Sequence, residues 1–417
     1  MKRITMLLAV TMLALAPAAF ATNGYFLHGQ GTGAKAMAGA GVALPQEALD
    51  ADTNPASAAF IDSGYSASLA LFNPDRQYTI SGAPSGQPGT FGLTPGTVTS
   101  KSKYFPMPSI GFNFRPTALD AVAVNLTGHG GMNTDYRTNT FYGGDHTGVD
   151  LAQGFLTTTY ARKLGDRQSL GISAIVAYQR FKAQGLQAFT IFSSNPDCLS
   201  NNGYENSYGL GVRAGYFAKI LPNLTFGASY TPTIKMSKLD KYCGLFAQEG
   251  GFDIPQSDMA GLAYTPIEPL TFALDYQRIH YSDVRSVGNG LIPNLVSQPL
   301  GSEGGAGFGW SDINVYKFGV QWKANPEWTL RAGYSKNDQP IPSSEVLFNI
   351  LAPGVIEQHY TAGVSKTMRR GGKFNAAVMY APAKTVRGAN PLEVPGQQQI
   401  SLRMHEWELE FGYSFGF

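Results

Sequence analysis

The sequence predicts an all-β fold: a transmembrane antiparallel β-barrel of about 14 strands with an N-terminal hatch, or plug, inside its lumen. Three observations predict it. The chain begins with an export signal, many segments place an apolar residue at every second position, and long connections alternate with short ones. Together they indicate an exported chain that crosses the outer membrane of a Gram-negative bacterium with strands.

Residues 1–21 have the three regions of a secretory signal peptide. Basic residues follow Met1, an apolar run extends to Ala16, and Ala19-Phe20-Ala21 supplies a cleavage site. The apolar run is shorter than the roughly 20 residues that a helix needs to cross a bilayer. We therefore expect the mature chain to begin at Thr22.

The composition argues against a soluble enzyme. Only 14% of the residues are charged, against roughly 25% in a usual soluble domain. No second long apolar run occurs, which excludes membrane-spanning helices. The net charge of +2 gives no reason to expect nucleic acid as a partner. The six histidines and two cysteines form no metal-binding motif, so we expect no metal, cofactor or catalytic residue.

The C-terminal segment shows the strand pattern most clearly. From Trp407 to Phe417 every second residue is large and apolar, and the alternate set begins with Glu406, Glu408 and Glu410. Alternate side chains of a strand point to opposite faces, so this segment has one apolar and one polar face. A terminal Phe after such alternation resembles the signature by which the barrel-assembly machinery recognises its clients.

The lengths of the connections also alternate. Tight turns occur near residues 116–117, 165–166, 222–223, 266–267, 325–326 and 371–372, and long connections near 81–98, 137–149, 185–202, 239–255, 282–310, 339–355 and 387–399. Short periplasmic turns and long external loops are typical of outer-membrane barrels. The count gives about 14 strands in residues 63–417, with both barrel ends in the periplasm. A soluble β-sandwich shares the alternation in sequence but explains neither the loop lengths nor the terminal Phe.

The segment from Thr22 to Ile61 does not alternate and is rich in glycine and alanine. Such small side chains make no conventional core, and about 14 strands enclose a lumen too wide for their own side chains to fill. We therefore predict that residues 22–62 form a hatch inside the barrel.

The chain resembles the FadL/TodX family of outer-membrane transport proteins. The resemblance rests on Thr22-Asn23-Gly24-Tyr25-Phe26, His28-Gly29, residues 35–41 and Asn54-Pro55-Ala56. It implies that Gly24, Phe26, Asn54, Pro55 and Ala56 belong to a hatch, and that external loops capture a hydrophobic ligand. It also implies a kinked third strand through which the ligand leaves sideways into the membrane.

The third strand has an irregularity at the place where that kink is expected. Its alternation breaks at Gly128-His129-Gly130-Gly131, and glycine within a strand indicates a bulge or bend. An ordinary strand end that runs into the external loop explains the same residues. Gly128, Gly130 and Gly131 are therefore the candidate lateral gate.

Three basic residues alternate in phase with the polar side chains that face the lumen, and are therefore candidate ligand contacts. They are Arg213, Lys317 and Arg331. Because the row from Glu406 to Glu410 is also inward, we expect the two charge types to face each other across the lumen. A carboxylate ligand is the alternative partner of one cation.

Cys198 and Cys243 fall in the third and fourth long loops, which are neighbours when strands meander. A disulfide between them is one hypothesis, and two unpaired cysteines are the other.

The sequence thus predicts a monomeric channel for passive uptake of hydrophobic compounds, either long-chain fatty acids or small aromatic hydrocarbons. Its expected surroundings are outer-membrane lipid and lipopolysaccharide. A general porin and a surface adhesin or phage receptor are the alternatives, and the hatch argues against the porin.

Overall fold

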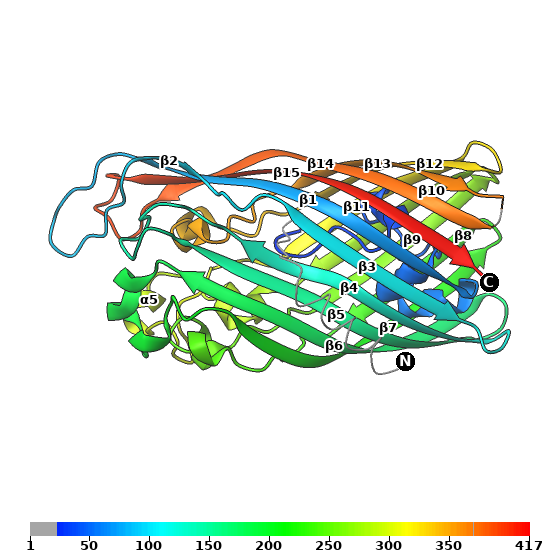
Figure 1. The fold of residues 1–417 in the computed structure, drawn as a ribbon, viewed down its shortest axis with the longest axis horizontal. Helices are drawn as coiled ribbons and strands as arrows, with labels where there is room; N and C mark the ends of the chain where they lie inside the picture. The colour runs from blue at the N-terminus through cyan, green and yellow to red at the C-terminus, as the bar shows by residue number, and fades with distance from the viewer. Residues whose placement is uncertain (1–22, 370) are drawn as a thin grey trace.

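The computed structural model describes residues 23–369 and 371–417, so the predicted signal peptide and Thr22 lie outside the described residues. The described chain forms one antiparallel sheet that closes because β15 pairs with β1. Figure 1 shows this barrel on its side, with the external loops at the left and the short turns at the right.

Fourteen of the fifteen strands in the described residues build the wall, which confirms the predicted barrel. They are β1 (Gly64–Ser81), β3 (Phe105–Phe114), β4 (Asp120–Asn133), β5 (Gly148–Lys163), β6 (Gln168–Gln184), β7 (Glu205–Leu221), β8 (Leu224–Thr231), β9 (Ser257–Ile267), β10 (Leu270–Ile279), β11 (Ile313–Lys323), β12 (Trp328–Asn337), β13 (Gln358–Thr367), β14 (Gly372–Ala389) and β15 (Gln399–Gly416). The remaining strand, β2 (Gly96–Thr99), is a short addition to β1 that the sequence did not predict.

The helices of the described residues are short, and none of them forms part of the wall. The N-terminal segment holds α2 (Thr32–Lys35), η1 (Ala48–Asp52) and η2 (Pro55–Phe60). The external loops hold η3 (Gln187–Phe192), η4 (Pro196–Cys198), η5 (Asp240–Tyr242), α3 (Ala247–Gly250), η6 (Tyr281–Asp283), α4 (Arg285–Gly288), α5 (Asn294–Ser297), η7 (Ser343–Glu345) and η8 (Phe348–Ile350). Among the residues that the structure describes, no helix is long and apolar enough to cross a membrane.

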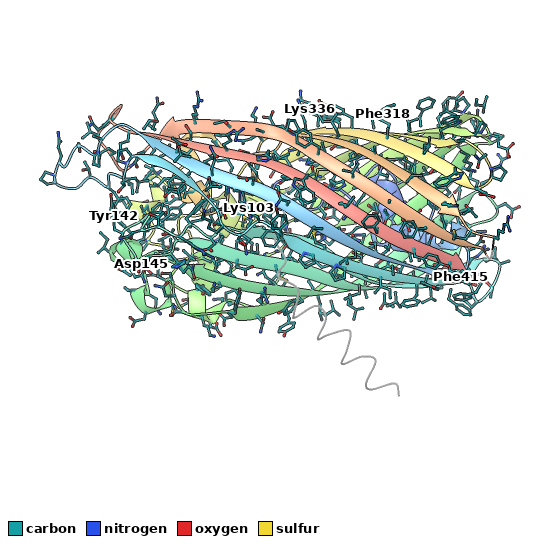
Figure 2. All side chains as sticks on the ribbon, turned by 45° about the horizontal axis from the view of Figure 1, so that its top comes forward. Lys103, Tyr142, Asp145, Phe318, Lys336 and Phe415 are labelled. Atoms are coloured by element: carbon teal, nitrogen blue, oxygen red, sulfur yellow. The ribbon has the colours of Figure 1, made fainter. Side chains whose placement is uncertain are left out.

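The outward face of the wall carries the apolar rows that the alternation predicts. Ile172 is 56% exposed and Tyr316 is 55% exposed, as are many side chains of the same parity on other strands. Figure 2 shows side chains around the whole barrel, with Phe318 on its outer face and Phe415 near the end where the turns lie. Burial of one such side chain is worth about 1.5–3 kcal/mol, so these rows are stabilised by lipid.

The N-terminal residues Asn23–Ser63, called the hatch below, lie inside the barrel (Figure 1). Most of their side chains are buried, and β1 begins at Gly64, one residue after the predicted start of the barrel. The hatch contacts strands on every side: η2 packs against β5, β6 and β7, while α2 packs against β13, β14 and β15. The lumen is therefore filled at this level by the chain's own N-terminus.

A belt of wall glycines makes room for the hatch. A side chain added at Gly333 would overlap the backbone of Met37 and Ala38, and one at Gly215 would overlap Asn54. The same holds for further inward glycines of other strands: Gly171, Gly227, Gly319 and Gly412. Such close approach of the wall backbone to backbone or side-chain atoms of the hatch requires the absence of a Cβ atom, which explains why glycine recurs at these inward positions.

We predict that Gly333→Leu displaces the hatch without preventing barrel formation. Overpacking of a close contact costs typically about 1–3 kcal/mol. Hydrogen exchange of residues 32–41 should be faster than in the wild type, while heat-modifiable migration on a gel reports the intact barrel. Ala332→Leu, one residue along β12 and exposed on the outer face, is the control. Unchanged exchange in Gly333→Leu would show that close packing is not required.

Candidate functional site

The third wall strand, β4, is bulged at the glycine-rich segment. Gly128 pairs with Gly154 and Gly130 pairs with Gln153, so His129 is one residue in excess of the register with β5. An extra residue bends a strand and increases its local twist. The irregularity lies within β4, which continues to Asn133.

From Thr127 onward, just before the bulge, β4 no longer pairs with β3. It pairs with β3 only from Val122 to Leu126, whereas its pairing with β5 extends to Asn133. Residues 130–133 of β4 and 148–155 of β5 are buried on both faces instead of alternating. The wall therefore has an unpaired edge on each side of this place, one on β3 and one on β4.

The start of the hatch occupies the free edge of β4. Phe26 forms an antiparallel bridge with Gly130, the Gly131 N–H donates to the Tyr25 carbonyl at 2.9 Å, and the Leu27 N–H donates to the His129 carbonyl at 3.3 Å. The Gln30 side chain donates to the Gly128 carbonyl at 2.7 Å. These bonds satisfy backbone groups that β3 leaves without a partner.

Aromatic rings pack at the bulge. The His129 ring stacks on Phe155 with centroids 3.9 Å apart, and Phe26 meets His129 edge-on at 4.5 Å. Such contacts contribute about 0.5–1.5 kcal/mol beyond the area they bury. Phe26 thus seals the bulge with its side chain as well as with its backbone.

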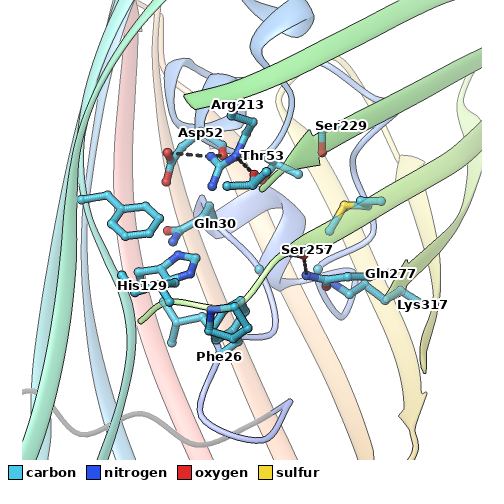
Figure 3. Close-up of a pocket in the computed structure, with 18 residues that line it drawn as sticks. Phe26, Gln30, Asp52, Thr53, His129, Arg213, Ser229, Ser257, Gln277 and Lys317 are labelled. Atoms are coloured by element: carbon cyan, nitrogen blue, oxygen red, sulfur yellow. Dashed lines mark hydrogen bonds and ion pairs between the residues drawn. The ribbon is translucent and has the colours of Figure 1, made fainter. Parts of the chain in front are cut away.

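A cavity of about 70 Å³ lies directly beside this seal (Figure 3). Its apolar side includes Phe26, Phe155 and Met259, and its polar side includes Asp52, Arg213 and Lys317. An engineered cavity that binds benzene measures about 150 Å³. The cavity in this structure is therefore smaller than one that holds an aromatic molecule.

Asp52 of the hatch ties three strands together below the bulge. Its carboxylate accepts hydrogen bonds from Thr127 of β4 at 2.7 Å and Thr157 of β5 at 2.9 Å. It also pairs with Arg213 of β7 at 3.0 Å, as Figure 3 shows. All the groups are buried, so the bonds form in a low dielectric where they are strong.

The Asn-Pro-Ala segment caps η2 and anchors it to the wall. The Asn54 side-chain oxygen accepts from the Ala56 N–H at 3.1 Å, and Pro55 takes the first helical position, which suits both residue types. The Asn54 amide donates to the Val42 carbonyl at 2.8 Å and to the Tyr216 carbonyl of β7 at 3.0 Å. One side chain therefore joins two parts of the hatch to the barrel.

The charges of the lumen are arranged differently from the prediction. Lys35 of the hatch pairs with Glu408 at 3.0 Å and with Glu410 at 2.6 Å, both on β15. Arg213, Lys317 and Arg331 instead bind groups of the hatch, which lies between them and β15. The predicted network of these three cations with the row from Glu406 to Glu410 is wrong for this reason.

The other two candidate cations also bind the hatch. Lys317 donates to the His28 carbonyl at 2.9 Å. Arg331 donates to the Gln46 side chain at 2.9 Å and to Gln321 at 2.8 Å. Lys317 lines the cavity with Arg213, whereas Arg331 is not among its lining residues.

The external loops form an apolar layer above the hatch. A second, smaller pocket lies among them, with the lining residues Val149, Phe181, Leu199, Leu245, Phe308 and Phe348. These residues come from four different loops and from two strand ends. The loops thus offer an apolar surface on the outer side of the barrel.

Sequence reasoning did not single out Asp52 and Lys35 as hatch residues that bind the wall, or Asp275 as a wall residue that binds the hatch. Asp275 of β10 accepts the Gly41 and Val42 N–H groups at 2.7 and 2.9 Å. The available signal for Asp275 was an acidic residue at an inward position of a strand in a chain with few charges. The sequence carries no signal for the groups that bind Asp275, because the fold of the hatch decides which groups lie beside it.

The two cysteines lie next to each other in the external loops but are unbonded in the structure. The Gly244 N–H donates to the Cys198 carbonyl at 3.2 Å. Burial and a hydrogen bond with Cys198 raise the pKa of the Cys243 thiol. The disulfide between them stays a prediction.

We expect protein exported to an oxidising compartment to carry that disulfide. Mass spectrometry of purified, unreduced protein should detect no free thiol and a cross-linked peptide that contains both cysteines. Two alkylated thiols in the unreduced sample would contradict the expectation.

We predict that Lys35→Met weakens the hold of the hatch. It leaves Glu408 and Glu410 buried without their cation, a loss that costs about 3–5 kcal/mol. The midpoint of denaturant-induced release of the hatch, followed by hydrogen exchange of residues 32–41, should fall. Lys238→Met, which breaks an exposed pair with Glu249, should leave it unchanged. Equal midpoints for Lys35→Met and the wild type would show that the buried pair is not stabilising.

Known structures share this architecture. A FadL homologue of Pseudomonas aeruginosa has a TM-score of 0.68 at 17% identity, with 94% of this chain and all of that chain covered. The Pseudomonas putida toluene transporter TodX gives 0.66 at 17%, covering 95% and 100%. The Ralstonia pickettii toluene transporter TbuX gives 0.62 at 18%, covering 94% and 99%. At these identities the likeness shows the fold.

No curated protein sequence matches the chain. Residues 7–404 match the family described as outer membrane protein transport protein (OMPP1/FadL/TodX). This match spans the hatch and nearly all of the wall, including the bulged strand. The chain therefore belongs to the OMPP1/FadL/TodX family of outer-membrane transport proteins.

Proposed function

We propose that the protein takes up small hydrophobic compounds passively, and that they leave through the wall at the bulge of β4. The observation that carries this proposal is the bridge between Phe26 and Gly130. At this place β3 and β4 do not pair with each other, and the start of the hatch closes the wall instead. Movement of that segment opens the cavity toward β3 and the lipid.

The proposed route begins in the external loops. An apolar molecule enters the pocket among Leu199, Leu245 and Phe308, and then reaches the cavity beside Phe26. Lateral exit is favourable because an apolar solute gains about 25 cal/mol per Å² of surface that leaves water. A path through the lumen would pass the charged contacts of Asp52 and Lys35.

We propose monoaromatic hydrocarbons as the preferred substrate class and fatty acids as the second. Two of the similar structures are toluene transporters by name, and the apolar side of the cavity includes the rings of Phe26 and Phe155. A fatty acid carboxylate would instead bind Arg213 or Lys317, the two candidate cations that line the cavity. Competition between labelled toluene and a long-chain fatty acid distinguishes them.

Deletion of His129 tests the lateral route. It removes the extra residue, so that β4 pairs with β5 in continuous register and extends along β3. Uptake of labelled toluene by cells that lack other such channels should fall to the background rate, while the barrel remains heat-modifiable.

His129→Ala is the matched control because it keeps the bulge and loses only the ring. It should retain most of the uptake. Full uptake after the deletion would overturn the lateral route.

A general porin is the competing function. Proteoliposomes that contain the protein should not swell in sugar solutions, because the hatch and its hydrogen bonds fill the lumen at this level. Rapid swelling with the wild-type protein would favour the porin.

A further inference from the structure

An external loop, residues 280–312 between β10 and β11, reaches down to the start of the hatch. Its first helical residue, Tyr281, is fully buried. The Tyr281 hydroxyl donates to the Asn23 carbonyl at 2.5 Å and accepts from the Tyr25 N–H at 3.2 Å. One hydroxyl therefore satisfies a donor and an acceptor of the segment that closes the wall.

The hatch is shaped to receive this tyrosine. Gly24 has a φ of +67°, and a Cβ atom there would lie 2.6 Å from the Tyr281 hydroxyl. Only glycine combines that backbone conformation with that contact. The Tyr281 ring also lies 5.0 Å from the Tyr25 ring and 5.7 Å from the Phe26 ring, between centroids.

The far end of the same loop makes a second contact. The Trp310 ring lies 5.6 Å from Tyr25 and 5.1 Å from Tyr281. Its indole N–H donates to the Asn349 side chain at 2.6 Å, and Asn349 donates to the Phe308 carbonyl at 2.7 Å. Asn349 belongs to the next external loop, so two loops are joined above the hatch.

The loop that holds the hatch also lines the pocket of the external loops. Ser286, Ala306 and Phe308 lie between Tyr281 and Trp310 in sequence and contact that pocket. A molecule in the pocket would therefore contact the loop on which both aromatic contacts depend. The outer pocket and the seal of the wall thus share one element.

We propose that the β10–β11 loop is a latch, and that Tyr281 is the positioning residue that keeps the start of the hatch on β4. The latch rests on the proposed function in that its release opens the lateral path. The hatch residues from Asn23 to Leu27 stay on β4 while the loop is in place, and they leave it when the loop moves.

Hydrogen exchange of the purified, detergent-solubilised protein tests the latch. Tyr281→Phe removes two hydrogen bonds and keeps the ring, so amides of residues 23–31 should exchange about tenfold to a hundredfold faster. Trp310→Phe should accelerate the same peptide, since it removes the indole bond to Asn349. Heat-modifiable migration confirms that each barrel is formed.

Tyr242→Phe is the matched control. Tyr242 is buried in another external loop, where its hydroxyl donates to the Gly203 carbonyl at 2.6 Å and accepts from the Ala183 N–H at 3.1 Å. It bonds no hatch residue, so exchange of residues 23–31 should remain at the wild-type rate. Wild-type exchange of this peptide in both Tyr281→Phe and Trp310→Phe would overturn the latch.

Toluene uptake separates the latch from the proposed function. Faster exchange with faster uptake in Tyr281→Phe supports both. Faster exchange with unchanged uptake supports the latch and shows that release of this segment does not limit transport. Exchange is measured without any ligand, so its result is independent of the substrate.

Discussion

The structure depends on one requirement: the wide lumen of a fourteen-stranded barrel has to be filled by backbone whose polar groups are all bonded. The hatch meets this requirement with partners from the wall. Asp275 binds two of its N–H groups, Thr361 binds Ala36 and Ala38, and Asn113 binds its last carbonyls. Each partner stands at an inward position of a strand, so the wall supplies hydrogen bonds to the hatch from several of its strands.

The same requirement explains the bulge. Around the bulge at His129, β4 keeps its pairing with β5 but has no pairing with β3 beyond Leu126. An open sheet edge within a membrane is costly because lipid offers no hydrogen bonds. The Tyr25 carbonyl and the Leu27 N–H supply those bonds. The unpaired edge of β4 and the start of the hatch therefore complement each other.

The interior is layered in polarity. Near the short turns the hatch is held by buried charges, such as Lys35 with Glu408 and Glu410. Toward the loops the contacts become aromatic, with Tyr25, Tyr281 and Trp310 packed around the first residues of the hatch. The hatch residues that bond to β4 are thus held by hydrogen bonds and ring contacts, and those farther from the loops by buried charges.

The sequence by itself determined the barrel, because the alternation of apolar residues and the lengths of the connections can be read from the chain without knowledge of its neighbours in space. It also located the irregular strand, since glycines at 128, 130 and 131 interrupt a period of two. It did not determine which groups bind the hatch: Arg213 meets Asp52, Lys317 meets His28, and Tyr281 meets Gly24 across hundreds of residues. Only the tertiary structure decided these pairs, because a segment without periodicity takes its conformation from the surface around it.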